Sequence, residues 1–146
     1  MIPIKSRQGF TLLEVLIALS LFAVGLLAVA TLQGTGLRAA GAAELRTQGR
    51  AAAKSLAEHL LALPYDHDDL QDVNGNGRAG LDDRDDEDAP ADHVWEPPGI
   101  ARIRVFWNIA EDDPVPGLKT VRILALWQAQ GGKQSTTLEF IRAAGF

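Results

Sequence analysis

The fold of this protein is decided by residues 9–19, which read GFTLLEVLIAL. They open an apolar stretch in which Glu14 is the only charged residue from Phe10 to Gln33. At a rise of about 1.5 Å per residue, roughly 20 such residues cross a hydrocarbon core about 30 Å thick. Residues 10–33 are therefore predicted to form a membrane-spanning helix.

The residues before this stretch indicate its orientation. Lys5 and Arg7 precede the apolar run, and positive charge on that side favours a cytoplasmic N-terminus. An ordinary secretory signal is the alternative, because the small residues around Val29 would suit a cut that releases a soluble protein starting near Thr31. Glu14 argues against that alternative, since a carboxylate within the membrane costs about 2.5 to 3.5 kcal/mol and a disposable signal has no need of one.

Residues 9–19 resemble the signal of type IV prepilins and type II secretion pseudopilins. The resemblance implies that a prepilin peptidase cuts after Gly9 and methylates the new amine of Phe10. It also implies that Glu14, the fifth residue of the mature chain, pairs with the amino terminus of a neighbouring subunit during assembly. Physical chemistry agrees, because an unpaired carboxylate and an unpaired ammonium are both costly in a low dielectric.

The resemblance continues over residues 23–27 and 32–33, which are similar to minor pilins of the PilV type. It implies an α+β, pilin-like fold, in which a long N-terminal helix packs on a small antiparallel sheet. Two features of many major pilins are missing. The chain has no proline in the middle of the helix and no cysteine for a disulfide-closed loop.

One helix is predicted from about Phe10 to about Leu63, because no proline occurs between Pro3 and Pro64. Its second half, residues 34–63, is predicted to be amphipathic and to cover the sheet with a stripe of apolar residues: Leu37, Leu45, Ala52, Leu56, Leu60 and Leu63. Four glycines each weaken the helix by about 1 kcal/mol, which makes the membrane exit its expected bend: Gly34, Gly36, Gly41 and Gly49.

The rest of the chain is predicted to be a polar loop over residues 64–99 and a sheet over residues 100–146. Three strand-like runs, 100–109, 120–128 and 135–142, suggest a three-stranded meander. In the first run Ile103, Val105 and Trp107 alternate with Arg102, Arg104 and Phe106. Trp107 and Trp127 are expected in the core rather than on a ligand platform.

The polar loop contains a candidate calcium site. Residues 72–83 read DVNGNGRAGLDD, with oxygen-bearing side chains at positions one, three, five and twelve and glycine at position six, which is the spacing of an EF-hand-type loop. Asp83 replaces the usual glutamate and no exiting helix follows, so the affinity is expected to be lower. Four side chains are predicted to bind the ion directly, together with the backbone carbonyl of Arg78 at position seven and a water held at Gly80, position nine. The four side chains are those of Asp72, Asn74, Asn76 and Asp83.

The alternative is that residues 72–83 form ordinary solvated turns. Crowding favours the cation, because 11 of the 19 acidic residues lie between Asp66 and Asp92 and repel one another. The run at 84–88 either adds a ligand or is a solvated charge run, and the solvated run is preferred.

No catalytic constellation is found. His59, His67 and His93 are scattered, and His67 is expected at the surface, with a transition-metal contact as the weaker reading. A pI near 5.1 argues against a protein that mainly binds nucleic acid.

The sequence therefore predicts a non-enzymatic minor pilin with a leader at residues 1–9. It would be held in the inner membrane and then taken into a type IV pilus, with its other domain facing the periplasm. The partners that the resemblance implies are other major and minor pilins, the prepilin peptidase and the inner-membrane assembly platform. The alternatives are a minor pseudopilin of type II secretion and, from a different class, a secreted calcium-binding interaction module.

Overall fold

The computed structural model describes residues 10–86, 88–129 and 131–144. The predicted leader, including Gly9, lies outside them. The chain divides into two compact units, Met1–Gly41 and Ala42–Phe146, and each is described by itself. Helix α1 (Leu12–Ala62) contributes to both units, so it confirms the predicted long helix and ends just before Pro64.

In the first unit, α1 is an exposed apolar helix. It contains an 18-residue segment with a mean hydropathy of 2.7, none of it buried, so its length and composition allow it to cross a membrane. Leu37, predicted to lie on the stripe that covers the sheet, is 77% exposed. The prediction was wrong there, because the buried stripe begins only in the second unit.

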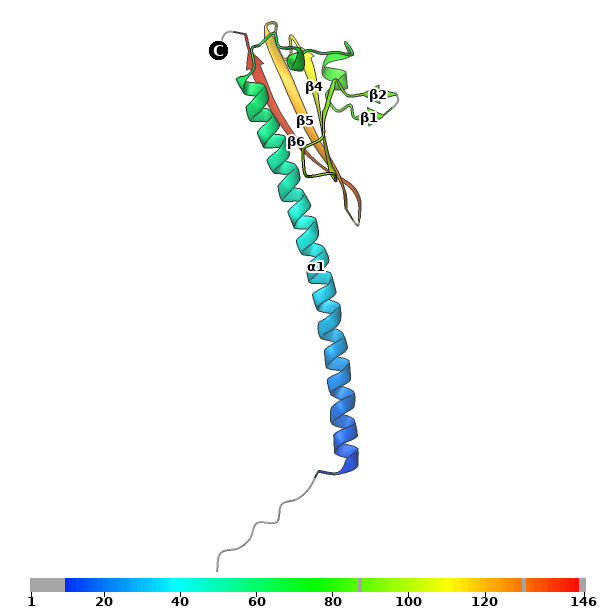
Figure 1. The fold of residues 1–146 in the computed structure, drawn as a ribbon. Coiled ribbons are helices and arrows are strands. Elements are labelled where there is room, and N and C mark those ends of the chain that lie inside the picture. The colour runs from blue at the N-terminus through cyan, green and yellow to red at the C-terminus, as the bar shows by residue number, and fades with distance from the viewer. Residues whose placement is uncertain (1–9, 87, 130, 145–146) are drawn as a thin grey trace, which may run out of the picture. The chain divides into compact units, whose positions relative to one another are not determined.

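The second unit contains a four-stranded antiparallel sheet in the order β3-β4-β5-β6 (Figure 1). Its strands are β3 (His93–Trp95), β4 (Ile103–Glu111), β5 (Leu118–Ala129) and β6 (Gly132–Ala143). A small hairpin, β1 (Asp85–Asp86) and β2 (Ala89–Pro90), and two 3-10 turns, η1 (Asp68–Leu70) and η2 (Gly77–Gly80), lie between the helix and the sheet in sequence.

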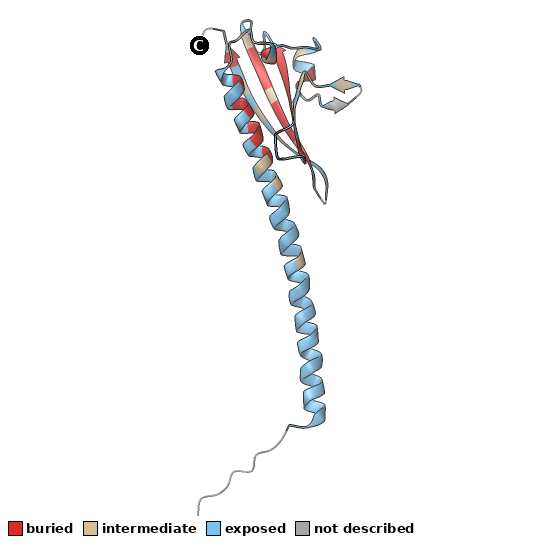
Figure 2. Ribbon diagram, viewed as in Figure 1, coloured by how far each residue is buried: buried red, intermediate tan, exposed pale blue. Residues whose placement is uncertain are grey.

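The core lies between the C-terminal part of α1 and one face of the sheet. Figure 2 shows the buried residues on that part of the helix and on β4 and β5. Trp107 and Trp127 belong to the core, as predicted, and are 7% and 5% exposed. The helix contributes five buried residues to it: Ala52, Ala53, Leu56, Ala57 and Leu60.

Two predictions about the sheet need correction. The sheet has four strands rather than three, because β3 forms inside the segment 64–99 that was predicted to be loop. Phe106 was placed opposite the core residues of its strand, yet it is only 3% exposed. The reason is that η2 and the residues after it pack on the second face of β4, so β4 is buried on both faces.

The last strand closes the end of the helix. The Arg142 guanidinium donates from Nη1 to the carbonyls of Leu60 at 2.9 Å and Leu61 at 2.6 Å, and from Nη2 to the carbonyl of Leu63. Of these carbonyls, that of Leu60 also accepts the N–H of Leu63 at 3.3 Å. The cation supplies donors at the end of the helix, where carbonyls lack their usual helical partners, and it complements the negative end of the helix dipole. Arg142 is 8% exposed and is therefore a buried C-terminal cap.

Candidate functional site

The predicted processing and assembly residues lie at the start of α1. Phe10 is 83% exposed, and Thr11 immediately precedes the helix. The backbone N–H of Glu14 donates to Thr11 Oγ1 at 3.3 Å, so Thr11 acts as the N-cap and Glu14 stands at the third helical position. Thr11 was missed by the sequence analysis, although the pattern Thr-x-x-Glu predicts such a cap. Glu14 is exposed, and its negative charge suits the first turn of the helix.

The predicted calcium loop is a folded turn organised around Asp72. Its carboxylate accepts the N–H of Gly75 at 2.7 Å through Oδ1 and the N–H of Gly77 at 2.8 Å through Oδ2. Gly77 has a φ of 57°, the left-handed conformation expected of the glycine at position six. The backbone therefore makes the sharp turn that the sequence spacing predicts.

The middle and the end of the loop come together through Asn76. Its Nδ2 donates to Asp83 Oδ2 at 2.6 Å, which joins positions five and twelve. A Cβ atom at Gly80 would collide with the Asn76 side chain, so a larger residue at position nine would displace Asn76 from its place beside Asp83. Asn74 is held differently, because its Oδ1 accepts the N–H of Asn76 and its Nδ2 donates to the carbonyl of Pro90.

Asp92 fastens this loop to the sheet. Its Oδ1 accepts the N–H groups of Val73 at 3.0 Å and Asn74 at 3.2 Å, and its Oδ2 accepts the N–H of Ile109 at 2.8 Å. The pKa of Asp92 is raised, mainly by burial and to a smaller extent by the nearby charge of Asp72. The hydrogen bonds from the backbone oppose this shift without cancelling it.

Asn108 is the second anchor that the sequence analysis missed. It is 1% exposed and donates through Nδ2 to the carbonyls of Leu81 at 3.2 Å and Asp83 at 2.8 Å. Its Oδ1 accepts the N–H of Asp92 at 2.9 Å. A buried amide with its partners in place fixes the position of the loop, because leaving any of them unpaired would be costly.

Arg78 links the loop to the turn between β4 and β5. Its Nη1 lies 2.9 Å and 3.2 Å from the two carboxylate oxygens of Asp113. The pKa of Asp113 is lowered, mainly by a hydrogen bond with Thr120 and, to a smaller extent, by the Arg78 guanidinium. The Arg78 side chain thus points away from the loop, which leaves only its carbonyl for the predicted ligand role.

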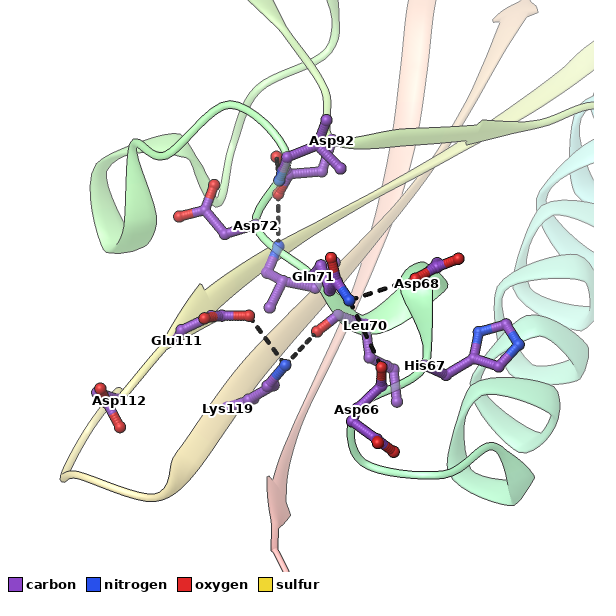
Figure 3. Close-up of polar contacts among 12 residues, drawn as sticks. Asp66, His67, Asp68, Leu70, Gln71, Asp72, Asp92, Glu111, Asp112 and Lys119 are labelled. Atoms are coloured by element: carbon purple, nitrogen blue, oxygen red, sulfur yellow. Dashed lines mark hydrogen bonds and ion pairs between the residues drawn. The ribbon is translucent and has the colours of Figure 1, made fainter.

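Lys119 is a buried cation that contacts the beginning of the acidic segment through Leu70. Its Nζ donates to the carbonyl of Leu70 at 2.7 Å and to Glu111 Oε1 at 2.9 Å, and it lies 4.8 Å from the centre of the Tyr65 ring (Figure 3). His67 caps η1, because its Nδ1 accepts the N–H of Asp69. His67 therefore has a structural role in this turn.

The donor set fits a calcium ion better than it fits a transition metal. Within residues 10–86, 88–129 and 131–144, no group of three or more His, Asp or Glu side chains could hold a metal. Asp72 and Asp83 supply two carboxylates, and the remaining predicted donors are neutral oxygens, which calcium accepts and which bind transition metals less well. The two carboxylates are joined through the backbone at Gly77 and the side chain of Asn76.

The helix, the sheet and the cap at Thr11 define a pilin-like layout. Residues 4–30 match the family model for the prokaryotic N-terminal methylation motif, the type IV prepilin-like signal. This motif and the apolar helix indicate membrane anchoring, and they support a precursor of type IV pilin or pseudopilin kind that is processed by a prepilin peptidase. No curated protein and no solved structure matches the chain.

Proposed function

We propose that this protein is a minor pilin, a structural and assembly subunit of a type IV pilus. Residues 10–33 hold it in the inner membrane with the N-terminus in the cytoplasm, and assembly moves this helix into the filament. The observation that carries the proposal is the methylation motif at residues 4–30, directly joined to an exposed apolar helix. Its partners are other pilins and the inner-membrane assembly platform.

Glu14 supplies the assembly chemistry in this proposal. The carboxylate of one subunit meets the amine of Phe10 of a neighbour, and the pairing removes two unpaired charges from a low dielectric. Only one axial register joins these two groups, so the pair selects that register. A minor pseudopilin of type II secretion would use the same chemistry and is the second candidate.

The processing step is tested by measuring the N-terminus and the intact mass of the protein co-expressed with a prepilin peptidase. The expected product begins at Phe10 and carries one methyl group. A product that begins near Thr31 would replace the filament proposal with a secreted domain. Purification of assembled pili and of type II secretion complexes from the same cells then separates the two candidates, because the protein should be found in the pili.

We also propose that residues 72–83 bind one calcium ion. The convergence of Asp72, Asn76 and Asp83 in one turn supports it, together with a glycine of positive φ at position six. Binding to the folded state alone raises the thermal midpoint by mass action. We expect the midpoint of the full chain in detergent micelles to rise when calcium replaces chelator.

Asp72→Ala and Asp83→Ala should abolish that rise. Asp88→Ala is the matched control, because Asp88 is an exposed acid of the same segment outside the predicted loop. An unchanged midpoint in the parent protein, or an equal loss in the control, would reject the calcium site. Neither result would affect the processing test, because Phe10 and the loop lie in different units of the chain.

A further inference from the structure

A pocket lies away from residues 72–83, between the C-terminal turns of α1 and the edge of the sheet. It is a pocket of about 420 Å³, within the usual size range of ligand sites. The helix contributes Ser55, Leu56, His59 and Leu60 to its lining. We refer to it below as the tryptophan pocket, because Trp95 and Trp107 form its other wall.

The two tryptophans lie on one face of the sheet. Trp95 on β3 is opposite Val105, and Trp107 on β4 is opposite His93, so the two indoles are diagonal neighbours on adjacent strands. Trp107 is fixed in place, because its Nε1 donates to the carbonyl of Asp69 at 2.8 Å and its ring stacks on His93 with centroids 4.9 Å apart. Trp95 is half-buried and forms the more accessible part of the wall.

The charge of the pocket comes from Asp69. This residue lines the pocket, and 41% of its side chain is exposed. Its carboxylate lies 3.6 Å from His67 Nδ1, a contact that is an ion pair only when the histidine is protonated. Asp66 and Asp68 are exposed acids of the same turn, and no lysine or arginine lines the pocket. The pocket thus places aromatic walls beside a partly exposed acidic residue, and His59 is the lining residue that could itself carry a positive charge.

We infer that the tryptophan pocket receives an arginine side chain of a partner protein. A guanidinium is attracted to the negative face of an indole and pairs well with a carboxylate, and its planar shape suits a slot beside aromatic rings. Its apolar stem would contact Leu56 and Leu60 at the helix. The pocket belongs to the second unit, whereas Phe10 and Glu14 belong to the first, so binding of the arginine does not require that pair.

The inference can be tested with N-acetyl-arginine amide as the probe. The full chain in detergent micelles, labelled with ¹⁵N at tryptophan, contains three indole N–H groups. The probe should shift the resonances of Trp95 and Trp107 in a saturable manner. Trp127 should not shift, because it packs against Gly49 and does not line the pocket.

Two comparisons test the chemistry of binding. N-acetyl-citrulline amide has nearly the same shape without the charge, and it should bind more weakly. Asp69→Asn should weaken binding of the arginine probe by about two- to fivefold, the range for an exposed ion pair. This variant keeps the backbone groups of Asp69 that bond to His67 and Trp107, so the turn should stay folded. Asp88→Asn is the control and should bind the probe like the parent protein.

Three results would overturn the inference. The first is no saturable shift at Trp95 and Trp107, and the second is equal binding of the arginine and citrulline probes. The third is equal weakening by Asp69→Asn and Asp88→Asn, which would mean that only the general charge of the segment attracts the probe.

Trp95→Leu provides a second variant, and it should abolish the shift at Trp107 without changing the Trp127 resonance.

Discussion

At the scale of single residues, Gly49 is fixed by a neighbouring ring rather than by backbone freedom. A Cβ atom at this position would lie 2.7 Å from Trp127 Cζ3. The sequence analysis treated Gly49 together with Gly34, Gly36 and Gly41 as a weak point of the helix. The structure separates them, because the other three have no atom within 4 Å of such a Cβ. Gly49 is therefore a packing residue.

Gly49→Ala should destabilise the second unit although alanine favours helix. Forcing a methyl group against a buried ring costs about 1 to 3 kcal/mol. Replacing glycine by alanine in a helix gains about 1 kcal/mol, so the packing cost is expected to outweigh the gain. Denaturant unfolding of the full chain in micelles, followed by tryptophan fluorescence, measures the change. Gly41→Ala is the matched control and should cause no loss. A gain in stability from Gly49→Ala would contradict the packing argument.

Asp113 gives the protein a defined response to acid. The pKa of Asp113 is lower in the folded state than its ordinary value of 3.8. Its contribution to the free energy of unfolding is therefore complete at a pH above 3.8, and it is lost as the pH falls through the pKa of the folded state. Asp113→Asn removes this contribution. The difference in thermal midpoint between the parent protein and this variant should be largest near neutral pH and should become smaller below pH 3.8. A difference that does not change with pH would contradict the Arg78 pairing.

At the scale of elements, the C-terminal end of α1 depends on β6. Arg142→Met keeps the apolar stem and removes three hydrogen bonds from a charged donor to the last carbonyls of the helix. We expect a loss of about 2 to 3 kcal/mol in the free energy of unfolding, and faster hydrogen exchange near residues 60–63.

Arg102→Met is the control for this change. Arg102 is exposed and precedes β4, so its replacement should alter the free energy of unfolding by no more than about 0.5 kcal/mol. If the two variants were equally stable, Arg142 would not be the cap of the helix.

The elements also show what could be predicted from the sequence. The long helix and its end before Pro64 follow from apolar spacing and from proline, which are local signals. Strand β3 has only three residues and no pattern of its own, and it forms because β4 offers it a partner. The ligand spacing of residues 72–83 is likewise local. Its anchors, Asp92 and Asn108, were missed because they contact the loop across 18 to 27 residues of chain.

At the scale of the whole molecule, the two units carry separate tasks. The first unit carries the methylation motif and the apolar helix, and the second carries the core, the acidic segment and the tryptophan pocket. A change in the first unit should therefore affect assembly without affecting the fold of the second.

Glu14→Ala should show this separation. We expect the amount of protein in sheared pili to fall tenfold or more, because tenfold corresponds to about 1.4 kcal/mol and an unpaired buried charge costs more than that. The denaturant unfolding of the second unit should be unchanged. Glu44→Ala is the control, because Glu44 is an exposed glutamate on the same helix whose carboxylate accepts a hydrogen bond from Gln48. Equal incorporation of the two variants would reject the assembly role of Glu14.

The cap provided by Arg142 has a consequence for biosynthesis. The guanidinium that closes the helix at Leu60–Leu63 belongs to β6, which follows these residues by 79 to 82 positions in the chain. Until β6 has been synthesised, the end of α1 lacks the Arg142 cap, and the edge of β5 that pairs with β6 has no partner strand. The second unit therefore completes its fold only after β6 has been synthesised, well after the residues of α1.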